Sequence, residues 1–317
     1  MTQEPGWAAL PPSSARWLLP TKPRKAAASS VRIYHPMTIK GLVGWQAARI
    51  AASLGAFAFL PRGASLPAGV AESLRSNDID YESLAVAKAN HPARFLVLLL
   101  GRSLECTGVA KIALDAQGQA ALEREALGIK DARQVMKETV QPPSLRAVGP
   151  GLLLLDPVPW LPRLKPWRLP IEAARALGSY SRIKSPERAD GWIVAHGDFA
   201  PWNLFQTKTG WVLLDWEHSS VKPPFFDFWH YVLQAHTLLR RPSAQALVAG
   251  VNGAKGWVRD ALLAYAGGLG RSPEDAPRFF DDYLSASAEQ LAGKSHKEKR
   301  GLDIRQHLQR QISKVDP

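Results

Sequence analysis

The stretch HGDFAPWNLF, residues 196–205, carries the most informative group of polar side chains in the chain. It directly follows the apolar run 192–195 (WIVA), and Asp198 and Asn203 lie five positions apart within it. A second group, LLDWE, places Asp215 twelve positions after Asn203. Short apolar runs that end in polar residues are typical of strands that deliver side chains to loops. The pattern predicts that the two loops meet at one site.

The residue types and their spacing indicate phosphoryl-transfer chemistry. Moving a phosphoryl group from a nucleotide requires a carboxylate that orients the acceptor hydroxyl and oxygen ligands that hold Mg²⁺. Kinase catalytic loops place the base five positions before a metal-binding Asn, and a later Asp supplies a further metal contact. We therefore predict that Asp198 is the catalytic base and that Asn203 and Asp215 bind Mg²⁺. Glu217 either binds a second Mg²⁺ or only shapes its loop.

These motifs resemble those of the aminoglycoside phosphotransferase and choline kinase family, which are small-molecule kinases with a protein-kinase-like fold. The resemblance covers roughly residues 81–290. It implies an α+β, two-lobed fold, with a small N-terminal β-sheet lobe plus one helix and a larger, mainly helical C-terminal lobe. It also implies ATP as the phosphoryl donor, Mg²⁺ as the cofactor and a hydroxyl group of a small molecule as the acceptor.

The resemblance assigns two residues to nucleotide phosphates. Lys111 resembles the strand lysine that contacts the phosphates, and Glu125 resembles the helix glutamate that pairs with this lysine. Glu123 remains an alternative partner, because the helix phase does not separate the two glutamates.

Further residues resemble the hinge and the supporting structure of the family. Leu155 and Asp156 resemble the hinge segment that holds adenine. Asp227 resembles the structural aspartate that braces the catalytic loop from the following helix. We expect His196 to form hydrogen bonds within the loop rather than to act as a base. We interpret the remaining nearby histidines as structural, because their spacing does not indicate a metal site: His218, His230 and His236.

Periodicity and composition predict the order of elements along the chain. The predicted elements are an irregular segment at 1–25, helices at 38–60 and 117–129, and strands at 81–89, 94–103, 107–114 and 151–155. Three domains follow: residues 1–65 as a basic, partly irregular N-terminal extension, 66–157 as the small nucleotide-binding lobe, and 158–317 as the large catalytic and substrate lobe with a basic tail.

Charge and cysteine content restrict the protein class. Of the formal net charge of +12 over 317 residues, much lies in residues 1–63, which hold eight Lys and Arg against one acid. Cys106 is the only cysteine, which excludes an intramolecular disulfide and a cysteine metal cluster and favours a cytoplasmic location. The start of the chain lacks a secretory-signal pattern, and the apolar run 50–60 is too short to cross a bilayer as a helix.

The basic excess can attract nucleic acid, anionic lipid or phosphorylated substrates. We expect no nucleic-acid partner, because the basic segments do not interleave aromatic and basic residues. The leader near residues 16–20 resembles those of kinase-like proteins of bacterial surface-polysaccharide pathways. This similarity raises the hypothesis that the basic N-terminal segment makes peripheral contact with an anionic membrane or with envelope-assembly enzymes.

Two departures from the kinase pattern define the alternatives. The expected phosphate-covering turn, residues 88–93 (KANHPA), contains no glycine, which favours a pseudokinase or scaffold associated with surface-polysaccharide assembly. The intact set of Asp198, Asn203 and Asp215 favours an active enzyme instead. Gly197 stands where protein kinases carry an arginine, which disfavours a protein kinase. The basic large lobe would repel polycationic aminoglycosides, so a sugar, polyol, amino alcohol or glycan precursor is the expected acceptor.

Overall fold

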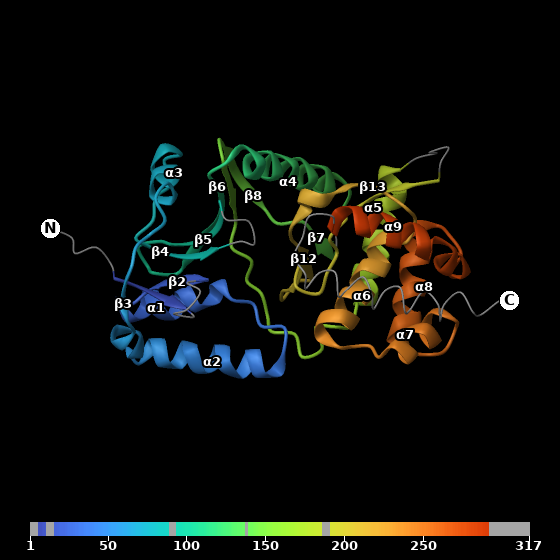
Figure 1. The fold of residues 1–317 in the computed structure, drawn as a ribbon, viewed down its shortest axis with the longest axis horizontal. Helices are drawn as coiled ribbons and strands as arrows, with labels where there is room; N and C mark the ends of the chain where they lie inside the picture. The colour runs from blue at the N-terminus through green and yellow to red at the C-terminus, as the bar shows by residue number, and fades with distance from the viewer. Residues whose placement is uncertain (1–5, 11–15, 89–92, 137–138, 186–190, 292–317) are drawn as a thin grey trace. The chain divides into compact units, whose positions relative to one another are not determined.

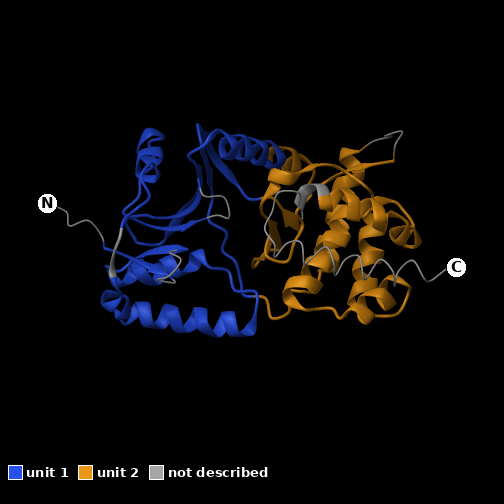
Figure 2. Cartoon of the chain, viewed as in Figure 1, with its two compact units in different colours: residues 1–129, 143–162 blue, residues 130–142, 163–317 orange. Residues whose placement is uncertain are grey.

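The structure, a computed structural model, describes residues 6–10, 16–88, 93–136, 139–185 and 191–291. The chain divides into two compact units (Figure 2). Residues 1–129 and 143–162 form unit 1, and residues 130–142 and 163–317 form unit 2. Residues 89–92 of the glycine-free turn and the basic segment after Gly293 lie outside the described residues.

Unit 1 is built on an eight-stranded sheet with the strand order β3-β1-β2-β4-β5-β6-β9-β8 (Figure 1). All neighbouring strands in it pair antiparallel. The strands are β1 (Trp7–Leu10), β2 (Trp17–Pro20), β3 (Arg62–Ala64), β4 (Ser83–Lys88), β5 (Arg94–Leu100), β6 (Cys106–Ala113), β8 (Leu145–Gly149) and β9 (Leu152–Leu155).

One apolar core layer of unit 1 lies on a single face of this sheet. Side chains alternate between the two faces of a strand, so every second residue of the central strands contributes to the same apolar layer. The shared layer, which includes two residues of helix α3 (Val70–Ser76), consists of Leu18, Val70, Leu74, Leu84, Val86, Phe95, Val97, Leu99, Ala110, Ile112, Leu152 and Leu154. Lys111 of β6 therefore points to the opposite face from its neighbours Ala110 and Ile112.

The helices of unit 1 differ in detail from the sequence prediction. They are α1 (Arg24–Ser30), α2 (Ile39–Ser53), α3 and α4 (Ala116–Val135), the last of which continues into unit 2. The helix expected at 38–60 ends at Ser53, and a short 3₁₀ turn, Ala56–Phe59, follows it. Gly55 separates the two with a φ of 89°, a left-handed conformation that glycine adopts at no steric cost.

The N-terminal segment is the main correction to the sequence prediction. The described parts of residues 1–25 are not irregular, because they contain β1, β2 and the start of α1. β2 pairs with β4, so the segment extends the sheet of the predicted nucleotide-binding lobe. The proposed division at residue 65 has no counterpart in the compact units. Pairing with an existing sheet edge stabilises four-residue strands that proline-rich composition alone disfavours.

Unit 2 is mainly helical and carries short strands near its loops. Its described helices are α5 (Ile171–Lys184), α6 (Phe226–Leu239), α7 (Ala244–Val251), α8 (Trp257–Leu269) and α9 (Phe280–Leu291). Its strands are β7 (Val140–Gln141), β10 (Ile193–Ala195), β11 (Leu204–Gln206), β12 (Trp211–Leu213) and β13 (Ser220–Lys222). β11 and β12 pair antiparallel, and β10 pairs with β13.

The α+β class predicted from the sequence is confirmed. Across the described residues, no helix combines the length and apolar character that crossing a bilayer requires.

Candidate active site

The loop that carries Asp198 begins where β10 ends, at Ala195, and runs to Asn203 before β11. Gly197 permits its first turn, because φ there is +83° and an added Cβ would lie 2.2 Å from the carbonyl oxygen of His218. The backbone N–H of Asn203 donates to the carbonyl of Ala200 at 3.0 Å, which closes a second turn. Gly197 and the backbone hydrogen bond between Asn203 and Ala200 therefore fix the path of the loop.

Asp227, in the first turn of α6, holds the start of this loop. Its two carboxylate oxygens accept hydrogen bonds from the backbone N–H groups of His196 and Gly197, at 2.8 and 3.0 Å. The side chain is fully buried. This is the bracing contact from the following helix that the resemblance implied. Burial raises the pKa of Asp227 to about 6, although the two backbone hydrogen bonds and the charge of Lys222 oppose the shift.

The raised pKa of Asp227 predicts a measurable pH dependence of stability. Between its usual value of 3.8 and about 6, the folded chain binds more protons than the unfolded chain. The free energy of unfolding contributed by this group therefore falls as pH rises through that window. We expect the stability advantage of wild type over Asp227→Asn to be about 2–3 kcal/mol larger at pH 4 than at pH 7. Urea denaturation of both proteins at both pH values measures the free energies of unfolding. An equal difference between wild type and Asp227→Asn at pH 4 and pH 7 would contradict the prediction.

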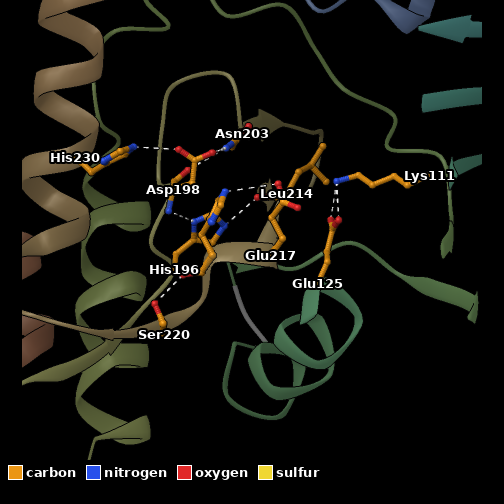
Figure 3. Close-up of polar contacts among 10 residues, drawn as sticks. Lys111, Glu125, His196, Asp198, Asn203, Leu214, Glu217, Ser220 and His230 are labelled. Atoms are coloured by element: carbon orange, nitrogen blue, oxygen red, sulfur yellow. Dashed lines mark hydrogen bonds and ion pairs between the residues drawn. The ribbon is translucent and has the colours of Figure 1, made fainter. Parts of the chain in front are cut away.

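His196 forms hydrogen bonds within the loop, as predicted (Figure 3). Its Nδ1 accepts from the backbone N–H of Asp198 at 3.2 Å, so Nε2 carries the proton and donates to the carbonyl of Leu214 at 2.9 Å. Burial lowers the pKa of His196 to about 4, which keeps the ring neutral near pH 7. The ring therefore links the Asp198 loop to the Asp215 loop.

Two side chains hold the carboxylate of Asp198 (Figure 3). The amide nitrogen of Asn203 donates to Asp198 Oδ2 at 3.0 Å and to its backbone carbonyl at 2.9 Å. Nε2 of His230 lies 3.0 Å from Oδ1. Burial alone would raise the pKa of Asp198, but the hydrogen bond and charge of His230, with smaller contributions from other histidines, lower it overall. Asp198 is therefore ionised at neutral pH.

His230 is a site residue that the sequence analysis missed. The sequence predicts a structural role for it, because its spacing does not match a metal-binding motif. It lies on α6 three positions after Asp227, so both residues face the loop from neighbouring turns of one helix. That three-residue spacing was the only available signal, and it becomes informative only once Asp227 is known to contact the loop.

The β11–β12 hairpin brings Asp215 next to this arrangement. Leu204 pairs with Leu213, and the backbone N–H of Leu214 donates to the carbonyl of Asn203 at 2.8 Å. Asp215 follows directly in a left-handed conformation, with φ at 61°. The structure therefore places Asn203 and Asp215 on adjoining ends of two paired strands, as the sequence predicted.

The donor set of these residues fits Mg²⁺. The amide nitrogen of Asn203 donates to Asp198, which leaves its amide oxygen available to a metal ion. Together with the carboxylate of Asp215, this oxygen would give Mg²⁺ the oxygen ligands that the ion prefers, and waters and phosphate oxygens would complete the shell. Within the described part of the chain, no group of three His, Cys, Asp or Glu side chains forms a closed metal cluster. Glu217 is largely buried, and its carboxylate lies 3.6 Å from Nε2 of His218.

In unit 1, Lys111 forms an ion pair with Glu125. The ammonium Nζ donates to both carboxylate oxygens of Glu125, at 2.7 and 2.9 Å. The Glu125 side chain is 1% exposed and that of Lys111 is 19% exposed. Glu123 is exposed, so the structure resolves the alternative in favour of Glu125. A buried carboxylate holds the ammonium group in one position, because an unpaired charge there would be costly.

The two predicted hinge residues lie at the end of β9. Leu155 is buried and pairs with Val109 of β6. Asp156 is half exposed, and its carboxylate accepts from Arg146 at 2.7 Å.

Comparison with known families identifies this arrangement. Residues 109–265 match the phosphotransferase enzyme family. This region is a phosphotransferase domain. The match begins in β6 and ends in α8, so the phosphotransferase domain includes Lys111, Glu125 and both loops of unit 2. The prediction of a kinase-type phosphotransferase is confirmed. No curated protein matches the chain.

Solved structures similar to this chain include three phosphotransferases. The ADP-bound aminoglycoside phosphotransferase APH(2'')-Ib is 11% identical over 78% of this chain and 99% of its own, with a TM-score of 0.48. The amicoumacin kinase hAmiN is 11% identical over 78% and 96%, with a TM-score of 0.45. The macrolide 2'-phosphotransferase MphH from Brachybacterium faecium is 14% identical over 73% and 95%, with a TM-score of 0.43. Because these TM-scores lie below 0.5, the assignment of the phosphotransferase domain rests on the family match.

Proposed function

We propose that this protein transfers the γ-phosphoryl group of ATP, with Mg²⁺ as cofactor, to a hydroxyl group of a small molecule. The observation that carries the proposal is the carboxylate of Asp198, which Asn203 and His230 hold at one end of the β11–β12 hairpin while Asp215 lies at the adjoining strand end. This is the set of a base and metal ligands that phosphoryl transfer requires.

In this proposal Asp198 orients the acceptor hydroxyl and takes its proton. The lowered pKa of Asp198 keeps the carboxylate ionised, so it accepts a hydrogen bond from the hydroxyl in the ground state. Phosphoryl transfer needs little covalent help, and most of the rate therefore comes from positioning and charge stabilisation. The hydrogen bonds from Asn203 and His230 restrict the carboxylate to one orientation, which is the positioning part of the catalysis.

The remaining residues are proposed to bind the nucleotide and the metal. Asn203 and Asp215 would hold Mg²⁺, which when bound neutralises charge on the β- and γ-phosphates. Lys111, fixed by Glu125, would donate to phosphate oxygens. Glu217 would serve as a further ligand or would support the turn after Asp215.

Two further assignments concern the nucleotide base and the acceptor. Leu155 would contact adenine through its apolar side chain, and the backbone of Asp156 would bind its polar edge. Residues 158–317 hold 22 Lys and Arg against 16 acids, which disfavours a polycationic acceptor. A neutral or anionic acceptor such as a sugar, polyol or glycan precursor therefore agrees best with the charge, and an amino alcohol remains within the proposal.

A thermal-shift titration with ATP tests the proposal. A ligand that binds only the folded state raises the melting temperature. We expect ATP to raise the melting temperature of wild type only when Mg²⁺ is present, and Asp215→Ala to lose this shift. Asp260→Ala, which removes an exposed carboxylate of α8, is the matched control and should keep the shift. No shift in wild type at millimolar ATP would contradict the kinase proposal and favour a scaffold.

A further inference from the structure

We propose that the outer face of α2 binds the surface of an anionic lipid bilayer. Four large apolar side chains on this helix are exposed: Ile39 (69%), Val43 (64%), Ile50 (60%) and Leu54 (73%), the last at the C-cap. We call this set the α2 stripe. Phe59, in the following 3₁₀ turn, is 90% exposed.

The α2 stripe lies on one side of the helix, with the exposed polar side chain of Gln46 at its edge between Val43 and Ile50. Its members are separated by four, seven and four positions. At 3.6 residues per turn, these intervals place all four within an arc of about 60°. Most of the exposed large side chains in this arc are apolar, whereas the solvent face of a surface helix in a globular domain is normally polar. The stripe therefore marks a surface that makes contacts beyond this chain.

The opposite side of α2 anchors the helix to unit 1. Trp45 and Ala52 lie there, seven positions apart, and both are buried. The indole Nε1 of Trp45 donates to the carbonyl of Val31 at 3.1 Å, and its ring lies 5.0 Å from that of Trp160. Figure 1 shows α2 along the margin of unit 1, with α1 beside it. The α2 stripe is thus presented on a firmly packed helix rather than on a loop.

The segment of the chain that contains α2 carries charge of a single sign. Residues 5–71 contain no Asp or Glu and eight Lys and Arg. Two of the eight, Lys40 and Arg49, lie on α2 itself and are exposed, and helix geometry places them on opposite flanks of the stripe. The guanidinium of Arg49 also lies 4.7 Å from the ring centroid of Trp45. An apolar stripe bordered by basic side chains is the arrangement of helices that lie flat in the headgroup region of anionic membranes.

Lipid accounts for the composition of this face better than a protein partner does. Cores of protein interfaces are enriched in Tyr, Trp, Met and Arg, whereas the α2 stripe consists only of Ile, Val and Leu. Binding to a leaflet of anionic lipids requires only apolar side chains that enter the leaflet and positive charge near its surface. The leaflet attracts basic side chains without regard to their order.

Vesicle co-sedimentation of the full chain tests the proposal. We expect wild type to bind vesicles of phosphatidylcholine with phosphatidylglycerol, and to bind pure phosphatidylcholine much more weakly. The double variant Ile50→Ser/Leu54→Ser should lower the partition coefficient at least about tenfold, because two aliphatic side chains no longer enter the apolar region. Lys40→Glu should lower binding to the anionic vesicles about fivefold or more, and raising the salt concentration should weaken binding of wild type.

The matched control removes exposed leucines elsewhere. Leu238→Ser/Leu263→Ser changes two exposed leucines of unit 2, on α6 and α8, and should leave vesicle binding unchanged. Because all substituted side chains are exposed, circular dichroism and the melting temperature should match those of wild type.

Three results would overturn the proposal. The first is no binding of wild type to anionic vesicles at low salt, and the second is equal binding by wild type and the Ile50→Ser/Leu54→Ser variant. The third is self-association in sedimentation equilibrium that this variant abolishes, which would assign the α2 stripe to an interface between two copies of the chain. None of these results depends on phosphotransferase activity, so the proposed function is tested separately.

Discussion

We expect Asp198→Asn to lower kcat by about 10²–10⁴-fold, because asparagine cannot accept the proton of the acceptor hydroxyl. The substitution keeps the size of the side chain, so the loop should hold its path through the hydrogen bonds from His196 and Gly197 to Asp227. Nucleotide binding should therefore remain. The measurement is Mg²⁺-dependent ATP consumption with an acceptor that sustains turnover of wild type, together with the ATP thermal shift.

The two readouts separate the roles that Asp198 could have. Full activity of the variant would show that Asp198 is not the base. Loss of the Mg²⁺-dependent thermal shift would show instead that Asp198 binds the metal–nucleotide complex. Asp260→Asn, the matched change of an exposed carboxylate on α8, should leave both activity and the thermal shift at the values of wild type.

We expect Gly197→Ala to destabilise the fold by about 3–5 kcal/mol. An alanine there would have to adopt a φ of +83°, and its Cβ would lie 2.2 Å from the carbonyl oxygen of His218. Backbone must therefore move, and the adjacent Asp198 would move with it. Urea denaturation measures the free energy of unfolding, and kcat should fall even where the variant is fully folded.

Gly253→Ala provides the matched control for the conformational cost. Gly253 has a φ of +100°, but nothing lies within 4 Å of an added Cβ. This variant should lose only about 1–2 kcal/mol, the cost of a left-handed conformation for alanine. Equal losses in the two variants would show that the contact with His218 does not restrict position 197.

Local sequence spacing predicted the chemical groups of the site well. Five positions between Asp198 and Asn203 fit one loop, and the hydrogen bond between their side chains shows that the loop folds back on itself. The apolar run before Asp215 predicted a strand. This strand, β12, pairs with β11, which follows Asn203, and the pairing explains why Asp215 lies close to Asn203. The catalytic and ligand roles of these residues remain predictions.

Contacts between distant elements could not be derived from the sequence. The choice between Glu125 and Glu123 depends on how α4 is rotated against the sheet, and the helix pattern leaves that rotation open by about half a turn. The contact of His230 with Asp198 depends on how α6 packs against the loop. These features follow from tertiary packing, which local propensity does not encode.

The N-terminal strands are a second feature that the sequence alone did not predict. WAAL in β1 and WLLP in β2 are each four residues long and show no clear alternation of apolar and polar residues. Four-residue strands are marginal on their own, so they form here because β4 offers a partner. Proline and small residues nearby led the sequence analysis to predict irregular structure.

The addition of β1, β2 and β3 beyond β4 has a consequence for how the chain can be shortened. The region that matches the family starts at residue 109, after all four of these strands. A shortened gene that starts at residue 65 would leave the backbone N–H and C=O groups of β4 open along one side. Exposed strand edges pair with other chains, so such a product would tend to form inclusion bodies rather than a working enzyme. The minimal folding unit is therefore longer than the region by which the family is recognised.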